Sequence, residues 1–307
     1  MCRLSFLVYL LIMYINSFLD YLLLERNYSS HTVKAYQNDL LAFKNFCVES
    51  FDISSLDEVH YNMIRNWIVS LVNQGVSNRT VNRKVSSLKT FYKYLQEIEV
   101  ITINPLAKHK SLKIKKEPQI PFSFQEVEQV LRNLNEEDFD SLRDKLLIDL
   151  LFSTGMRRIE LINLKETDIN LHSRTAKVLG KRNKERLVPL LPETIKVFNK
   201  YLVEKSKLGF DKEYLFVTSK GNKLYETLVY RIINSYFSKV SVKVKCSPHI
   251  LRHTFATELL KKGADLNSVK ELLGHSSLAS TQVYTHNNLE QLKQVFNNAH
   301  PRSPKKG

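Results

Sequence analysis

Apolar residues recur at three- and four-residue steps through most of the first hundred positions, which is the spacing of one buried helix face. The pattern predicts four helices and little strand: Ile15–Arg26, Ser30–Glu49, Tyr61–Gln74 and Asn78–Glu97. The apolar stripe of the fourth is the clearest, and it consists of Val81, Val85, Leu88, Tyr92 and Leu95. We therefore expect a helical N-terminal domain.

Basic residues fill the remaining positions of the fourth helix and continue into the segment after it. They are Arg79, Arg83, Lys84 and Lys89 on the helix, and Lys110 and Lys113 in the stretch Lys108–Lys116, which carries five lysines among nine residues. Asn104-Pro105 ends the helical pattern, so this stretch is a basic linker. These six cations are candidates for contact with nucleic-acid phosphates, and a solvated basic surface remains the alternative.

In the second half of the chain the spacing of apolar residues changes from helical to strand-like and back. Helical patterns at Phe124–Leu134 and Leu142–Ser153 are followed by two short β-prone runs, Thr175–Leu179 and Arg186–Leu190, joined by a basic turn. Helical patterns resume at Glu193–Lys205, Glu226–Lys239, Pro248–Lys262, Leu266–Leu273 and Asn288–Asn298. The pattern predicts a mostly α-helical second domain that carries a small hairpin sheet.

These elements divide the chain into five segments. They are an apolar N-terminal extension (1–12), a helical domain (13–106), a basic linker (107–121), a second domain (122–286), and a C-terminal helix with a basic tail (287–307).

The N-terminal extension has three interpretations. The apolar run Leu4–Ile15 is shorter than the roughly 20 residues of a spanning helix, and no small-residue cleavage site follows it. We favour an upstream extension from a misplaced start codon, because the segment after Met13 continues smoothly into the first helix. An apolar partner-binding tail and a targeting signal are the other two.

Charge narrows the class of partner. Forty-six Lys and Arg stand against 31 Asp and Glu, a formal net charge of +15. The excess is local, since residues 151–250 hold 20 basic and 9 acidic side chains while 118–150 hold 3 and 8. This balance favours nucleic acid or an anionic membrane. Three widely spaced cysteines suggest neither a disulfide framework nor a thiolate zinc site, which fits a reducing cytoplasm.

Four short segments carry candidate chemistry, and each is weak alone. They are Thr154-Gly155-Met156-Arg157-Arg158-Ile159-Glu160-Leu161, the turn lysine Lys181, the stretch from His249 through Arg252 to Thr257, and the stretch from His275 to Tyr284. His249 and His253 have the i, i+4 spacing of a zinc pair, but Ile250 stands where a zinc protease carries its Glu base. We therefore expect no metal.

Together the candidates are two arginines, a lysine, two histidines and a tyrosine, with no paired carboxylates. Such a set suits attack on a phosphodiester, because cationic groups stabilise charge on non-bridging oxygens and a tyrosine hydroxyl can act as a covalent nucleophile.

The motifs resemble those of the tyrosine recombinase (phage integrase) family, most closely its Xer branch. TGMRRIEL resembles the first arginine motif, GKRNKERLVPL the lysine hairpin, HILRHTFAT the His-x-x-Arg box, and LGHSSLASTQVYTH the final histidine and tyrosine motif. The resemblance runs from about Ile15 to Arg302. It implies a mainly α fold: a four-helix core-binding (SAM-like) domain followed by a mostly α catalytic domain with a small antiparallel sheet. Ile159 departs from the family, which often has a small Ser before the Glu.

The resemblance also implies roles for individual residues. The implied active site is Arg157, Lys181, His249, Arg252, His275 and Tyr284, with Glu160 in support. Tyr284 would attack the scissile phosphate and leave a 3′-phosphotyrosyl link and a free 5′-hydroxyl. The arginines would clamp the phosphoryl oxygens, Lys181 would protonate the leaving oxygen, His249 would assist proton transfer, and His275 would bond a non-bridging oxygen. No ATP, metal or other cofactor is required.

The implied partners are double-stranded DNA and a DNA translocase. The protein would act on DNA as a homo-tetramer or as a hetero-tetramer with a paralogous recombinase. The implied location is the cytoplasm, at the nucleoid, with no membrane partner. The C-terminal helix would dock on the neighbouring protomer. The implied process is chromosome dimer resolution at a dif-like site, ahead of cell division. Alternatives are an integrase or transposase of a mobile element, a DNA-binding relative without catalysis, and a type IB topoisomerase.

Overall fold

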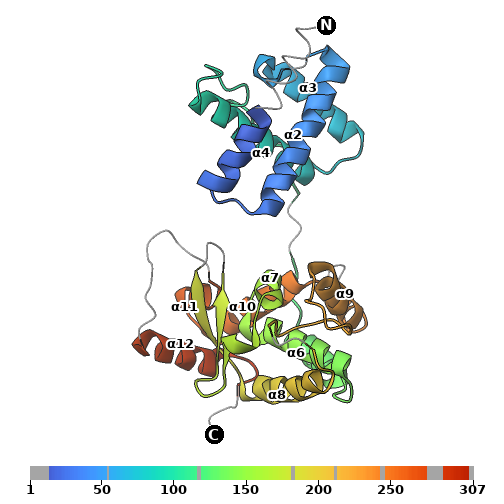
Figure 1. Ribbon diagram of the computed structural model, residues 1–307. Helices are drawn as coiled ribbons and strands as arrows, with labels where there is room; N and C mark the ends of the chain where they lie inside the picture. Colours follow the sequence, from blue (N-terminus) through green and yellow to red (C-terminus); the bar gives the residue numbers. More distant parts are fainter. Residues whose placement is uncertain are drawn as a thin grey trace. The chain divides into compact units, whose positions relative to one another are not determined.

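The chain divides into two compact units, Met1–Glu117 and Pro118–Gly307, which are described here one at a time (Figure 1). The computed structural model describes residues 14–53, 55–115, 119–180, 184–210, 213–242, 246–274 and 286–303. Within these residues, no helix combines the length and the apolar character that crossing a bilayer requires.

Unit 1 is a small helical domain built as the periodicity predicts. Residues 14–20 are helical and lead into the π-helical turn η1 (Tyr21–Glu25). Then come α2 (Ser30–Phe51), the 3-10 turn η2 (Leu56–Glu58), α3 (Tyr61–Asn73) and α4 (Asn78–Glu97). Ser29 and Ser77 cap α2 and α4, each accepting a backbone N–H three residues on. The helices enclose a core that includes Phe18, Phe43, Trp67, Leu88 and Phe91.

Unit 2 is mostly helical with one small sheet. Its helices are α5 (Phe124–Asn133), α6 (Phe139–Thr154), α7 (Arg158–Ile162), α8 (Pro192–Lys207), α9 (Glu226–Phe237), α10 (Pro248–Lys261), α11 (Leu266–Leu273) and α12 (His286–Ala299), with a 3-10 turn, η3 (Glu166–Asp168). The strands are β1 (Ile169–Asn170), β2 (Thr175–Leu179) and β3 (Glu185–Pro189). The mainly α fold with a small antiparallel sheet is confirmed.

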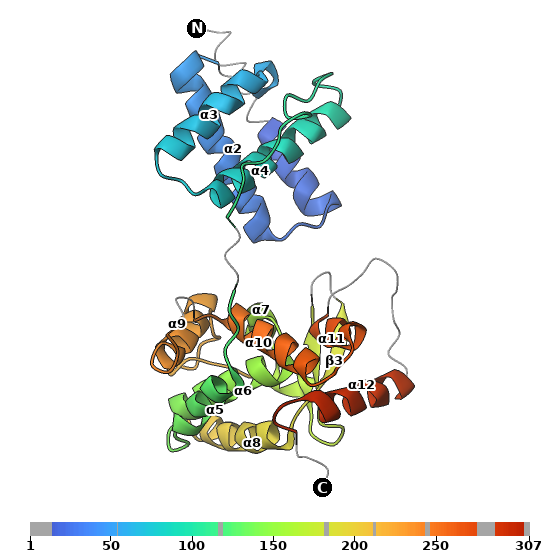
Figure 2. The same cartoon turned by 180° about the vertical axis from the view of Figure 1, so that it is seen from behind.

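Helix α6 is the centre of unit 2. It is buried on nearly every side and packs against α5, α8 and α10, which surround it in Figure 2. Because the helix is covered on most faces, the charged residues that it buries need partners, and Arg143 and Asp144 pair with each other. The helix begins three residues earlier than its apolar pattern predicts, since the Asp138 carboxylate caps it by accepting the Ser141 N–H at 2.9 Å.

The sheet has the order β1-β2-β3, antiparallel throughout, with Thr175 opposite Pro189 and Leu179 opposite Glu185. The β2–β3 hairpin agrees with the predicted strands. The two-residue strand β1 and the five-residue helix α7 are additions that the sequence pattern did not predict, because neither is long enough to show a period.

The C-terminal helix α12 packs on its own unit. Leu292, Phe296 and Ala299 join a cluster with residues of α10 and α11 that include Phe255 and Leu272. Beyond the helix, Arg302 forms ion pairs with the Asp149 and Glu128 carboxylates, at 3.0 Å for Glu128. In the single chain this helix therefore covers its own domain. Its docking on a neighbouring protomer stays a prediction.

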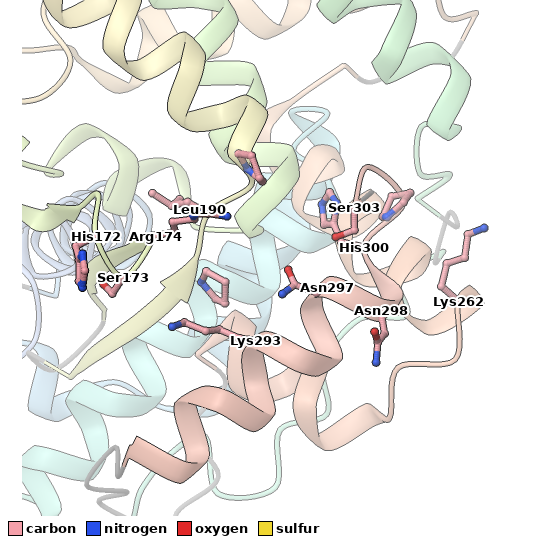
Figure 3. Close-up of a pocket in the computed structure, with 13 residues that line it drawn as sticks. His172, Ser173, Arg174, Leu190, Lys262, Lys293, Asn297, Asn298, His300 and Ser303 are labelled. Atoms are coloured by element: carbon pink, nitrogen blue, oxygen red, sulfur yellow. The ribbon is translucent and has the colours of Figure 1, made fainter. Parts of the chain in front are cut away.

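A pocket of about 740 Å³ lies beside α12, between the β1–β2 turn and residues 300–303, which follow the helix (Figure 3). Arg174, Lys262 and Lys293 contribute cations to its lining. His300 also lines it and is 3% exposed; burial, reinforced by the charge of Arg302, lowers the pKa of its imidazole to about 3. The ring is therefore neutral at physiological pH.

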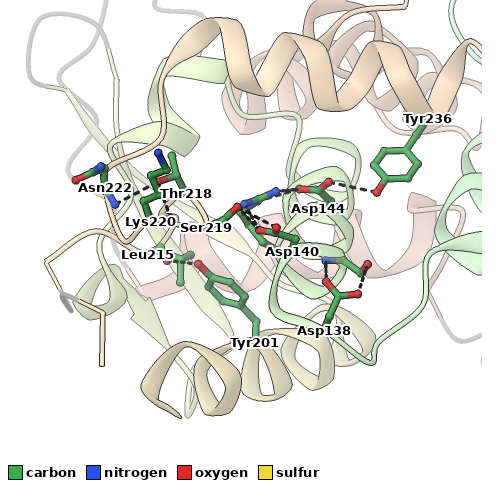
Figure 4. Close-up of polar contacts among 12 residues, drawn as sticks. Asp138, Asp140, Asp144, Tyr201, Leu215, Thr218, Ser219, Lys220, Asn222 and Tyr236 are labelled. Carbon is green, nitrogen blue, oxygen red and sulfur yellow. Dashed lines mark hydrogen bonds and ion pairs between the residues drawn. The ribbon is translucent and has the colours of Figure 1, made fainter. Parts of the chain in front are cut away.

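A polar network ties α6 to α9 and to the loop around the Val217–Lys223 bridge (Figure 4). The buried Arg143 guanidinium donates to the Asp140 and Asp144 carboxylates. Ser219 donates to Asp140 at 2.9 Å, and the Tyr236 hydroxyl donates to Asp144 at 3.3 Å. Burial and the nearby Asp144 charge raise the pKa of Tyr236 to about 12. These contacts hold α6 in place, and the candidate site lies at the C-terminal end of this helix.

Candidate active site

The site begins where α6 ends. Gly155 adopts a left-handed conformation with φ of 60°, and a Cβ at this position would lie 2.3 Å from the Phe255 ring. Only glycine allows so sharp a stop with so close a neighbour. The chain then turns into α7, whose N-cap residue is Arg157. The turn therefore brings Arg157 directly beside the end of α6.

Glu160 organises this turn. Its buried carboxylate accepts the Arg157 backbone N–H at 2.7 Å and Arg157 Nη1 at 2.7 Å. It also accepts Arg186 Nη1 at 3.0 Å and Nη2 at 2.7 Å, a bidentate pair. Burial alone would raise the pKa of Glu160, but the hydrogen bonds and charge of Arg186, followed by those of Arg157, hold it below its ordinary value. Glu160 is thus a carboxylate shared by two arginines.

A third arginine reaches the same place from α10. Arg252 is 8% exposed, and it donates to the Gly155 carbonyl at 2.6 Å and to the Leu273 carbonyl at 2.7 Å. Burial, followed by the charge of Arg157, lowers the pKa of its guanidinium to about 10, so it stays charged at neutral pH. We call Arg157, Arg186 and Arg252, together with Glu160, the arginine cluster.

The arginine cluster gathers at the C-terminal end of α11. Arg186 Nε donates to the Leu272 carbonyl at 3.0 Å, and Arg157 Nη2 reaches the Gly274 carbonyl at 3.3 Å. The last carbonyls of a helix lack helical partners and carry partial negative charge, so they hold guanidinium groups in place. Three guanidinium groups against one carboxylate leave a positive balance, and the Arg157 side chain is 36% exposed. Such a site can bind an anion from solvent.

The structure brings together part of the predicted active site. Arg157, Glu160 and Arg252 meet in the arginine cluster, and His249 lies three residues before Arg252 on α10, exposed and on the same helix face. Lys181, His275 and Tyr284 lie outside the described residues. The residues that precede two of them border the cluster: a Cβ on Gly180 would lie 3.5 Å from Glu160 Oε1, and one on Gly274 would lie 3.0 Å from Arg186 Nη1.

Arg186 is a residue of the candidate site that the sequence motifs do not indicate. The sequence pattern predicts only that it begins the strand Arg186–Leu190. In β3 it lies on the inward side with Val188, and it is 4% exposed. A charged residue at a buried position of a strand requires a charged or polar partner. Arg186 stands two residues before Val188 in the predicted strand, so both side chains face the same side. This alternation could have identified Arg186 as a buried charge that needs a partner.

Among the residues that the structure describes, no group of three or more His, Cys, Asp or Glu side chains lies close enough together to hold a metal ion. His249 and His253 are both exposed on α10. The pocket beside α12 shares no lining residue with the arginine cluster.

The six basic candidates of unit 1 fall into two groups. Arg83 donates to the buried Asp39 carboxylate at 2.5 and 2.9 Å, and Lys84 donates to it at 3.1 Å. Burial alone would raise the pKa of Asp39, but hydrogen bonds from Arg83, Ser87 and Lys84 hold it below its ordinary value. Arg83 and Lys84 therefore tie α4 to Asp39 of α2, which the sequence pattern did not indicate, and their contact with DNA phosphates stays a prediction.

The other four candidates, Arg79, Lys89, Lys110 and Lys113, are exposed. Asn78 Nδ2 donates to the Lys113 carbonyl at 2.9 Å, and Asn82 exchanges two hydrogen bonds of 2.8 and 2.9 Å with the Leu112 backbone. The linker is thereby attached to the first two turns of α4. We call the exposed residues Arg79, Lys89, Lys110 and Lys113 the basic surface of unit 1.

Sequence comparisons place this architecture among known proteins. Residues 121–291 match the Phage integrase family, and residues 15–97 match the N-terminal SAM-like domain of phage integrases. A tyrosine recombinase XerC of Staphylococcus aureus is 37% identical over 292 residues, covering 94% of this chain and 97% of the relative. A tyrosine recombinase XerC of Thermodesulfovibrio yellowstonii is 38% identical over 297 residues, covering 94% and 97%.

Solved structures agree. A crystal structure of the XerH site-specific recombinase, bound to a palindromic difH substrate in a post-cleavage complex, superimposes with a TM-score of 0.69 at 26% identity, covering 88% of this chain and 80% of that one. A lambda integrase dimer bound to a core site shares the fold, with a TM-score of 0.67 at 17% identity, covering 90% and 99%.

Proposed function

This chain belongs to the phage integrase family and is an Xer-like tyrosine recombinase, and from that premise we propose that it cuts and rejoins double-stranded DNA at a dif-like site to resolve chromosome dimers. The observation that carries the chemistry is the arginine cluster, in which Arg157 and Arg252 are held beside each other with excess positive charge. Preorganised cations of this kind stabilise the negative charge that builds on a phosphoryl group under attack.

The proposed reaction starts with the Tyr284 hydroxyl as nucleophile. Its oxygen bonds to the scissile phosphorus while the bond to the 5′-oxygen breaks, leaving a 3′-phosphotyrosyl link and a free 5′-hydroxyl. Arg157 and Arg252 bind the non-bridging oxygens, Lys181 gives the leaving oxygen its proton, and His249 assists the transfer of the tyrosine proton. Rejoining reverses these steps with a 5′-hydroxyl of the partner strand, so the energy of the phosphodiester is kept.

Three features of the described residues support these assignments. Arg157 keeps an exposed side although Glu160 anchors it, so a phosphate can reach it. His249 lies one helical turn from Arg252. Gly180 and Gly274, which precede Lys181 and His275, both border the cluster, so the chain enters these two segments beside the proposed phosphate site. His275 would then donate a hydrogen bond to a non-bridging oxygen.

In this proposal, exposed cations of unit 1 bind the DNA. The basic surface of unit 1 would contact the phosphate backbone and supply affinity without reading sequence. Arg83 and Lys84 act differently in this proposal: Asp39 offsets one of their two positive charges, so they fix the position of α4 and add less attraction than two unpaired cations would.

The proposed working form is a tetramer on DNA, either of this chain alone or with a paralogous recombinase, at the nucleoid in the cytoplasm and activated by a DNA translocase. In that assembly α12 would leave its own domain and dock on the neighbouring protomer. In a solved complex, XerH is bound to a palindromic difH substrate, and a recombinase of this branch acting at a comparable site fits that precedent.

A suicide-substrate experiment tests the proposal. A nicked duplex carrying the dif-like site of the host chromosome is incubated in EDTA with wild-type protein or Tyr284→Phe and resolved on a denaturing gel. We expect a covalent adduct with wild type alone. If bound protein forms no adduct, the proposed site or the proposed chemistry is wrong. An adduct on a mobile-element end and none on the dif-like duplex would favour the integrase alternative, and relaxation of a plasmid without either site would favour a topoisomerase.

A further inference from the structure

We propose that Arg186 is a positioning residue for DNA cleavage: it neutralises and holds Glu160, so that Arg157 keeps both its orientation and its charge for the scissile phosphate. The inference rests on the proposed function and extends it to a residue of β3 outside the predicted catalytic set.

The geometry places Arg186 at the junction of the site. Its two terminal nitrogens bind the two oxygens of Glu160, at 3.0 and 2.7 Å, while its Nε binds the Leu272 carbonyl at 3.0 Å. One planar guanidinium thus joins the turn that carries Arg157 to the end of α11. A Cβ on Gly274 would come within 3.0–3.2 Å of the Arg186 side chain, so the chain just before His275 rests directly on it. Lysine has no equivalent fork and cannot make these three contacts.

Charge gives the same residue a second effect. Glu160 is needed to orient Arg157, since it binds both the backbone N–H and the guanidinium of that residue. Its negative charge would also offset the cation that it orients. Arg186 is 5% exposed in its side chain and cancels this charge at 2.7 Å, so Arg157 and Arg252 together present two uncompensated positive charges. Without Arg186 the same groups would present only one.

The effect of that charge depends on the substrate, which separates positioning from a merely structural role. Attack on a phosphodiester adds negative charge to a group that already carries one, whereas attack on a methylphosphonate starts from a neutral group. A site with one net positive charge is therefore better matched to the methylphosphonate. A variant that is simply misfolded would lose activity equally on both.

The experiment measures single-turnover cleavage of nicked duplexes with either a phosphodiester or a methylphosphonate at the scissile position, at saturating protein. The variants are Arg186→Met, Arg186→Lys, Glu160→Gln, and the Arg186→Met/Glu160→Gln double variant. Lys177→Met is the matched control, because Lys177 is an exposed cation on the neighbouring strand β2, 3.5 Å from the exposed Glu185. Circular dichroism and thermal unfolding verify that each variant is folded.

We expect Arg186→Met to slow phosphodiester cleavage by about 100-fold, because both the orientation of Arg157 and one net positive charge are lost. Methylphosphonate cleavage should slow by about 10-fold or less, because the lost charge matters little for a neutral group. Arg186→Lys should fall between wild type and Arg186→Met. The double variant should be no slower than Arg186→Met, because the two residues act as one unit. Lys177→Met should match wild type.

Equal losses on both substrates, an unchanged rate in Arg186→Met, or additive losses in the double variant would each overturn the role of Arg186. The absence of an adduct with wild-type protein would instead contradict the proposed function, so the two failures are distinguishable.

Discussion

The two units use the same device for different ends. In unit 1 the buried Asp39 carboxylate holds Arg83 and Lys84, and in unit 2 the buried Glu160 carboxylate holds Arg157 and Arg186. The surroundings differ: the Arg83 side chain is 49% exposed, whereas that of Arg186 is 5% exposed. Water therefore screens the Arg83–Asp39 pair more than the Arg186–Glu160 pair, while Arg157 beside that second pair keeps a side chain that is 36% exposed. In both units a buried carboxylate fixes the position of two cations. We infer that the exposure of those cations decides how strongly they can stabilise negative charge in a reaction.

The largest expected effect is a loss of cleavage rate on substitution in the arginine cluster of unit 2. Arg252→Gln removes a preorganised cation, so we expect single-turnover cleavage to slow by about 1,000-fold while DNA affinity changes little. Lys196→Gln, which removes an exposed cation on α8, is the control and should cleave normally. Quenched-flow adduct formation together with a binding isotherm measures both quantities. A parallel fall in affinity and rate would place Arg252 in DNA binding instead.

A second prediction concerns the turns. Gly155→Ala adds a methyl group 2.3 Å from the Phe255 ring at a φ of 60°, so unit 2 should lose about 2–4 kcal/mol of stability. Gly75→Ala in unit 1 meets no atom within 4 Å at a φ of 79°, so it should cost only about 1 kcal/mol. Denaturant unfolding measures both. Equal losses would show that Phe255 moves aside easily.

Asp39 should matter for the stability of unit 1 and for its acid response. Asp39→Asn weakens the ties to Arg83 and Lys84, and we expect a loss of about 1–3 kcal/mol at neutral pH. Because the pKa of Asp39 is lowered in the folded state, its contribution is present above its ordinary value of 3.8 and is lost as the pH falls through the lower folded value. Unfolding of wild type and Asp39→Asn should therefore converge in acid. A constant gap between them down to the lowest pH would contradict this.

The smallest effects are expected on the basic surface of unit 1. Lys89→Gln and Arg79→Gln should each weaken DNA binding a few-fold and reduce the slope of log affinity against log salt by about 1. Arg83→Gln should change the slope less, because Asp39 already offsets part of its charge. Binding isotherms at several salt concentrations provide the test. An Arg83 slope change as large as that of Lys89 would show that the ion pair opens on DNA.

Long amphipathic helices were predictable because their period repeats several times, as in α4, where Val81, Val85 and Leu88 are all buried. The predicted bounds of α11, Leu266–Leu273, match the structure, in which Asp265 caps its start and the left-handed Gly274 ends it. The start of α6 was placed at Leu142 instead of Phe139, because the capping role of Asp138 was overlooked. Elements as short as β1 and α7 present no period at all.

A local motif predicts Arg157 and Arg252 as site residues, and both side chains meet in the arginine cluster, while their catalytic roles stay predictions. Arg186 was missed because its partners Glu160 and Leu272 are far away in the sequence. The same distance hid Asp39 from Arg83 and Lys84, which therefore looked like free cations. Long-range pairing of charges depends on the fold, so a single sequence shows the charges and leaves their partners open.

The most direct test of the account measures the rate of covalent adduct formation on the nicked dif-like duplex as protein concentration rises to saturation. It compares wild type, Arg252→Gln and the double variant Arg79→Gln/Lys89→Gln. We predict that saturation restores the unit 1 variant to the wild-type rate, because it lacks only affinity, and leaves Arg252→Gln about 1,000-fold slow. A unit 1 variant that stays slow at saturation, or an Arg252 variant that recovers, would contradict the division of labour between the exposed and the buried cations.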